Sequence, residues 1–161
     1  MFARSHLDLH NIRLSIERIK KLSDNVVGVG PVGIGLDGIL GFIPPVGMAY
    51  SAGAGLMLVA DGVRARASAP TIVQMTTFLV LDTFSSLIPG VGGIVDALFT
   101  GHKWAANLLI KHMDETIYFE GRRRDVKDTR EYAELISRIR SGKEKRRVVF
   151  LGDLLATATT A

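Results

Sequence analysis

Residues 81–92 of the chain read Leu81-Asp82-Thr83-Phe84-Ser85-Ser86-Leu87-Ile88-Pro89-Gly90-Val91-Gly92 and hold the main clue to its fold. The same pattern occurs earlier as Leu36-Asp37 followed by Ile43-Pro44-Pro45-Val46-Gly47. In both copies the isoleucine stands seven positions after the leucine. Proline removes a backbone donor and disfavours helical angles in the residue before it, and glycine permits a reversal of the chain. Each copy therefore predicts a short apolar helix, a Pro/Gly turn and a second apolar helix.

This twofold repeat predicts an all-α protein with two helical hairpins, over about residues 36–66 and 70–119. The outgoing helices are expected at residues 48–66 and from 94 to about 119, and Pro70 suits the first turn of a helix that runs to about residue 87. The residues assigned to the two turns are Pro44, Pro45, Gly47, Pro89, Gly90 and Gly92.

Residues 1–24, before the repeat domain at 25–119, are expected to form an amphipathic helix. It spans about residues 5–22, where Ser5 and Asp8 resemble a capping box and the apolar stripe is Leu9, Ile12, Ile16 and Ile19. After the repeat domain comes a basic charged tail, residues 120–161. The tail contains a short helix capped by Asp128 and Glu131, with the stripe Tyr132, Leu135, Ile136 and Ile139, and then an apolar patch at 148–151.

The composition is apolar for a soluble protein, because 47% of the 161 residues are hydrophobic and the mean hydropathy is +0.24. The 17 glycines indicate that small residues contribute much of the packing, and the lack of cysteine excludes disulfides and thiolate metal sites. The first 21 residues mix charges throughout, so we expect no secretory signal and a cytosolic N-terminus.

The repeat region also has features of a membrane protein. The 23 residues from Gly38 to Ala60 carry no charge, although the Pro44-Pro45 pair divides them. Lysine and arginine stand at every junction between units, which favours hairpins that enter and leave on the cytosolic side. Small residues recur every four positions at Gly47, Ser51 and Gly55, so they lie on one face of a helix. Such a face lets a second helix approach closely in a membrane; the alternative is that it serves the packing of soluble helices.

Four acids interrupt the apolar segments: Asp37, Asp61, Asp82 and Asp96. Each is costly in lipid unless it pairs or faces a wet interior. Asp37 and Asp82 are equivalent in the repeat, and we expect each to cap a helix start; the alternative is a carboxylate pair that shares a proton or holds a cation.

The paired Leu-Asp and Ile-Pro-x-Val-Gly units, over roughly residues 30–115, resemble the domain of unknown function 4112 family of small bacterial proteins. Asn107 also falls where that pattern places it, whereas Gly47-Met48 and Gly92-Gly93 stand where the family tends to have Gly-Asp. The resemblance implies a membrane-associated helical domain and no known activity.

Motifs for catalysis, metals and cofactors are weak, so we expect no catalytic, metal or cofactor residues. Gly28, Gly30 and Gly33 match a dinucleotide fingerprint in spacing but lack its strand-helix-strand context. His6 and His10 have a metal-compatible spacing without an evident third ligand.

Twelve of the 20 lysines and arginines follow residue 110, where the Arg122–Arg124 run suits anionic headgroups and no motif supports nucleic-acid binding.

The leading hypothesis is a non-enzymatic, membrane-associated helical protein in the bacterial cytoplasmic membrane with cytosolic termini. Its expected partners are membrane lipid and a protein partner or a second copy, as in a self-assembling or accessory subunit. One alternative is a cytoplasmic, soluble interaction module, for which the polar stripe Asp96, Thr100, Lys103, Asn107 and Lys111 should face water. Another is a small ion-conducting or transporter-like membrane protein with Asp82 and Asp96 along a wet path.

Overall fold

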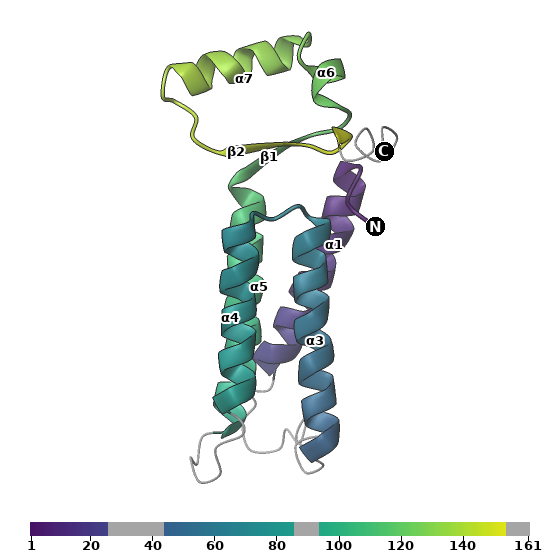
Figure 1. Cartoon of the computed structure of the whole chain (residues 1–161), viewed down its shortest axis with the longest axis vertical. Coiled ribbons are helices and arrows are strands. Elements are labelled where there is room, and N and C mark those ends of the chain that lie inside the picture. Colours follow the sequence, from purple (N-terminus) through teal and green to yellow (C-terminus); the bar gives the residue numbers. More distant parts are fainter. Residues whose placement is uncertain (26–43, 86–93, 154–161) are drawn as a thin grey trace.

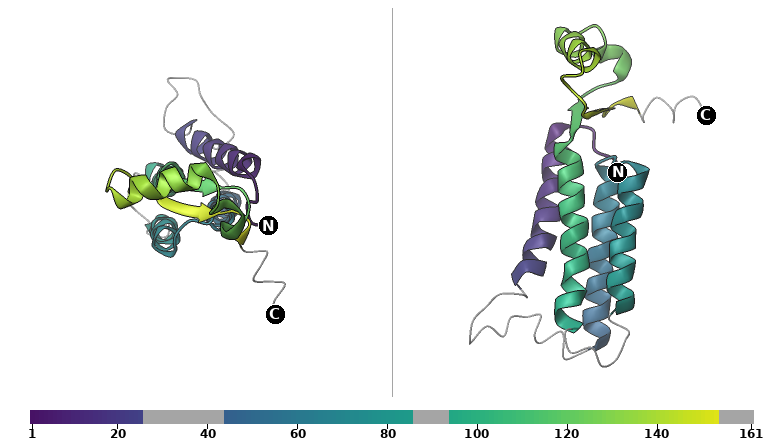
Figure 2. Two further views of the ribbon diagram at one scale, coloured as in Figure 1. Left: turned by 90° about the horizontal axis from the view of Figure 1, so that it is seen from above. Right: turned by 90° about the vertical axis from the view of Figure 1, so that its left-hand side faces the viewer.

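The computed structural model describes residues 1–25, 44–85 and 94–153. Four helices form an elongated bundle (Figure 1): α1 (His6–Asn25), α3 (Pro44–Arg64), α4 (Ala69–Ser85) and α5 (Ile94–Asp114). Helix α5 packs against the other three and lies between α1 on one side and the α3–α4 pair on the other (Figure 2). The helical class expected from the sequence is therefore confirmed for the described part of the chain.

Helix α1 begins as the sequence predicts. The Ser5 hydroxyl accepts a hydrogen bond from the Asp8 backbone N–H, and the Asp8 carboxylate accepts one from the Ser5 N–H, both at 3.2 Å. This reciprocal pair is a capping box. The apolar stripe from Leu9 to Ile19 is buried in the bundle core with Leu58, Met75 and Leu109.

Helix α3 starts four residues earlier than expected. Pro44, Pro45 and Gly47 belong to its first turn and not to a turn that precedes the helix. Proline fits there because the first helical N–H groups have no partner within the helix. The other expected turn residues, Pro89, Gly90 and Gly92, and the expected first arm of the first unit, residues 36–43, lie outside the described residues. The two arms of the second unit are α4 and α5, which pack along each other, but the full repeat stays a prediction.

A small unit stands on one end of the bundle (Figure 1), and we call it the cap, residues 116–150. It consists of β1 (Thr116–Phe119), α6 (Arg123–Val126), α7 (Arg130–Arg140) and β2 (Arg147–Phe150). The strands pair in parallel, with Thr116 opposite Arg147 and Phe119 opposite Phe150. The rings of Phe119, Tyr132 and Phe150 lie 5.7 to 6.0 Å apart, centroid to centroid, and form the centre of a second apolar cluster.

The cap corrects the expectation of a purely helical chain. The last bundle helix ends at Asp114 and does not continue to about residue 119. Its expected end, Thr-Ile-Tyr-Phe, is instead a strand, because β-branched and aromatic side chains suit a sheet once a partner strand is present. That partner lies in the predicted tail, where the apolar patch at 148–151 contributes to β2. Helix α7 is also capped one residue later than expected, by Thr129, whose hydroxyl accepts from the Tyr132 N–H.

Candidate functional site

The outer face of α3 and α4 is uncharged and mainly apolar. Leu56 is 72% exposed on α3, and Val73 and Leu81 are 63% and 61% exposed on α4. Every exposed side chain within residues 52–63 and 69–81 is uncharged. We call this surface the α3–α4 face; its large apolar members are Leu56, Met57, Val63, Val73, Val80 and Leu81.

Polar side chains are buried beneath that face. The Asp82 carboxylate on α4 lies 3.2 Å from Nδ1 of His102 on α5, and the two side chains are only 2% and 5% exposed. The Gly101 N–H donates to the other Asp82 oxygen at 3.2 Å. On α3, the Asp61 side chain is 4% exposed and accepts from the Arg64 guanidinium at 2.8 Å. The bundle therefore has ionisable side chains in its interior, beneath the α3–α4 face.

The four acids have different positions. Asp82 lies near the C-terminal end of α4, so the expectation that it caps a helix start is wrong. It binds across to α5 because the side chain is buried there and needs polar partners. Asp61 lies in α3 and Asp96 in α5, while Asp37 and the surroundings of the Asp96 side chain lie outside the described part. Within the described ranges, no three histidine or acidic side chains come together as metal ligands.

Glycine makes the close helix contacts around this polar pair. A Cβ on Gly101 would lie 2.5 Å from the Asp82 Cβ and 2.9 Å from the Phe78 carbonyl oxygen, so α5 approaches α4 closely only with glycine there. A Cβ on Gly55 would lie 3.4 Å from His102 Nε2. Gly55 thus lies where α3, α4 and α5 meet, whereas Gly47 and Ser51 lie in α3 with surroundings outside the described part.

A second polar cluster, which local sequence patterns do not predict, surrounds His112. The Nε2 atom of His112 accepts from the Ser68 N–H and lies 3.2 Å from the Arg147 guanidinium, which also donates to it. Nδ1 then carries the proton and donates to the Thr71 hydroxyl at 3.1 Å, and the Thr71 hydroxyl lies 2.8 Å from that of Ser68. Burial, followed by the charge of Arg147, lowers the pKa of His112 below its ordinary value. The neutral ring therefore connects α5, the α3–α4 loop and β2.

Arg66 fixes the same loop and is likewise not predicted by local sequence patterns. Its backbone is left-handed, with φ of 56°, and it ends α3 in the position where glycine is usual. Its guanidinium donates to the carbonyls of Phe150, Ala3 and Leu151. One side chain thereby joins the N-terminal segment, the α3–α4 loop and the end of β2, which accounts for a strained residue at this point.

A basic depression of about 370 Å³ lies on the cap beside α6. Its lining residues are Arg122, Arg123, Arg124, Lys127 and Asp153, and we call it the basic pocket. The three arginines expected to contact headgroups thus lie together at one depression. Asp153 accepts a hydrogen bond from the Arg123 N–H at 2.8 Å.

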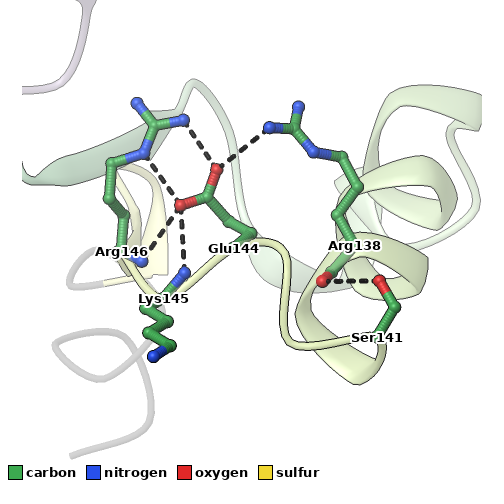
Figure 3. A network of polar contacts seen from close by, with 5 residues as sticks. All are labelled: Arg138, Ser141, Glu144, Lys145 and Arg146. Carbon is green, nitrogen blue, oxygen red and sulfur yellow. Dashed lines mark hydrogen bonds and ion pairs between the residues drawn. The ribbon is translucent and has the colours of Figure 1, made fainter.

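The other charged cluster of the cap is internally satisfied. The Glu144 carboxylate accepts from the backbone N–H groups of Lys145 and Arg146 at 3.1 Å and from the Arg146 guanidinium at 2.7 and 2.9 Å (Figure 3). Arg138 adds a longer contact at 3.4 Å. These bonds, those of Arg146 first, lower the pKa of Glu144 to about 2. The cluster closes the loop between α7 and β2, so we assign it a structural role.

The comparison that decides the family covers the bundle. The family profile described as a domain of unknown function (DUF4112) matches residues 12–113, which is more than half of the chain. The chain belongs to this family. No curated protein and no solved structure is significantly similar to it. The DUF4112 match runs from α1 to the last turn of α5 and stops before β1, so the cap lies outside it.

Two further findings concern the hypotheses drawn from the sequence. Among the described helices of this DUF4112 member, none combines the length and the apolar character needed to cross a membrane. On α5, the stripe residues Lys103, Asn107 and Lys111 are exposed.

Proposed function

We propose that this DUF4112 protein is a non-enzymatic, membrane-associated helical protein that lies side-on against the cytoplasmic membrane of a bacterium. The α3–α4 face contacts the acyl chains, and the outer sides of α1 and α5, on which Arg18, Lys103 and Lys111 are exposed, face water. The observation that carries the proposal is the set of large apolar side chains that the α3–α4 pair exposes, among them Leu56, Val73 and Leu81, while its acids Asp61 and Asp82 are buried. Helices in contact with lipid turn ionisable groups inward in this way.

The sidedness supports a surface position over a crossing. A helix assembly that is apolar on one side and charged on the other suits the interface plane, with its apolar side a few ångströms into the acyl region. Each large side chain of the α3–α4 face contributes on the order of 1 kcal/mol when it leaves water. Trp104, which is 56% exposed and packs edge-on against Phe78 at 5.6 Å, suits the rim of such a contact because its ring is amphipathic.

Flotation with lipid vesicles tests this function. We expect the purified protein to float with vesicles and to stay bound in high salt, because the contact is apolar. Leu56→Glu and Val73→Glu should each weaken flotation about tenfold or more, while Asn107→Glu, which adds the same charge to the exposed side of α5, should float like the unchanged protein. Circular dichroism of all variants checks that the helices remain.

A soluble interaction module is the second candidate, because Lys103, Asn107 and Lys111 are exposed on α5. In that case the α3–α4 face binds a partner helix or a second copy. Lack of flotation at any lipid composition, together with a dimeric mass that Leu56→Glu reduces to a monomeric one, would support this candidate and contradict membrane association.

A further inference from the structure

The basic pocket lies next to the end of the α3–α4 face. Figures 1 and 2 show α6 above the C-terminal end of α3, the end at which Arg64 follows the apolar residues. The α6 residues that line the pocket and the C-terminal end of α3 thus lie at the same end of the molecule.

The charges of the pocket are unbalanced. Four of its lining residues, Arg122, Arg123, Arg124 and Lys127, are basic, and Asp153 is the single acidic one. Arg124 also contacts Asp125 at 3.5 Å, with both side chains well exposed, so that pair is weak. Among the described residues, no carboxylate lies within ion-pair distance of the Arg122, Arg123 or Lys127 side chains, in contrast to Arg146 on the same cap, which binds Glu144.

We propose that the basic pocket binds the phosphate of an anionic lipid headgroup, with a preference for a phosphomonoester. This inference rests on the proposed membrane association. Guanidinium groups match phosphate oxygens in pairs, and lysine adds a point charge. A phosphomonoester carries about 1.5 to 2 negative charges at neutral pH, which suits four cations against one carboxylate better than a singly charged phosphodiester does.

Asp153 has a defined part in this site. As the acidic residue of the pocket lining it repels a bound anion, so it weakens phosphate binding. Asp153→Asn keeps an oxygen that accepts from the Arg123 N–H and removes the charge. This variant should bind phosphate more tightly than the unchanged protein.

Two titrations test the proposal. In the first, vesicles of phosphatidylcholine contain phosphatidic acid, a phosphomonoester, or phosphatidylglycerol, a phosphodiester, at equal total negative charge. In the second, soluble glycerol phosphate is followed by NMR shifts of the cap amides. The triple variant Arg122→Gln, Arg124→Gln, Lys127→Gln should lose about tenfold or more in both titrations, and Asp153→Asn should gain in both.

The control removes the same charge from elsewhere on the cap, with Arg130→Gln, Lys143→Gln and Lys145→Gln, all exposed. It should retain the preference for phosphatidic acid. Equal binding to the two anionic vesicles, or an equal loss in the control and the pocket variant, would overturn the proposal.

The second titration separates this inference from the proposed function. Leu56→Glu should still bind glycerol phosphate while it loses vesicles. Glycerol phosphate binding without flotation of the unchanged protein would overturn a lipid source for the phosphate, and flotation without a phosphomonoester preference would overturn the pocket alone.

Discussion

At the scale of single residues, His112 is a half-buried base, and a second proton on its ring would disrupt its own contacts. Its Nε2 atom accepts hydrogen bonds from the Ser68 N–H and the Arg147 guanidinium. Protonation of Nε2 replaces this acceptor by an N–H donor, which then faces two other donors. The folded-state pKa lies below the ordinary value of 6.5, because burial and Arg147 outweigh the opposite effect of Glu115. The unfolded chain therefore binds more protons in the interval between the two pKa values.

This linkage predicts a loss of stability in weak acid. The contribution of His112 is complete above about pH 6.5 and is lost as the pH falls through the folded-state pKa. Urea midpoints between neutral pH and pH 5 should fall in the unchanged protein, and His112→Gln should reduce that fall. His10→Gln, an exposed position on α1, should leave the fall unaltered; the same reduction in both variants would contradict the assignment.

Arg66 and His112 show which residues local sequence patterns miss. Arg66 ends α3 with a left-handed backbone, and no rule of helix ends favours arginine over glycine there. The partners of its side chain lie 63 to 85 positions away along the chain, and Thr71 lies 41 positions from His112. Such contacts depend on the assembled molecule, so a reading of periodicity and motifs cannot supply them.

At the scale of helices, two glycines in the bundle should respond oppositely to the same change. Gly101→Ala places a Cβ 2.5 Å from the Asp82 Cβ and close to the Phe78 carbonyl, so α4 and α5 must separate. We expect a loss of about 2 to 4 kcal/mol in the free energy of unfolding. Gly53→Ala, on the exposed side of α3 with nothing within 4 Å, should gain about 0.5 to 1 kcal/mol through helix propensity.

Chemical denaturation of both variants measures the difference. Similar free energies of unfolding for Gly101→Ala and Gly53→Ala would contradict the close α4–α5 contact. The position of Gly101 is not evident from spacing, because the predicted stripe of Gly47, Ser51 and Gly55 lies on another helix.

The helices were predictable from the sequence where a capping motif or an apolar pattern lies within the helix itself. The capping box at Ser5 and the stripe that follows it define α1, and the apolar run with Pro44 at its front defines α3 within a few residues. The strands were not predictable, because each has only four residues and its partner lies about 30 positions away. A Thr-Ile-Tyr-Phe segment that follows a helix is predicted as a continuation of that helix unless its parallel partner strand is known.

At the scale of the whole molecule, one bundle carries two kinds of surface. The α3–α4 face is uncharged and mainly apolar and lies over buried acids, while α5 exposes Lys103, Asn107 and Lys111. The basic pocket of the cap lies beyond the end of α3, at the end where Arg64 and Arg66 lie. The sequence showed the apolar length and the basic residues, but only the packing assigns them to sides and to one end.

A polarity-sensitive fluorophore can show whether the α3–α4 face contacts lipid. The chain has no cysteine of its own, so Leu56→Cys and Asn107→Cys each give a single labelling site. With vesicles, the label at residue 56 should shift to the blue and be quenched by a quencher attached to the acyl chains, while the label at residue 107 should stay unchanged. Equal responses at the two sites, or a response at residue 107 alone, would contradict the account.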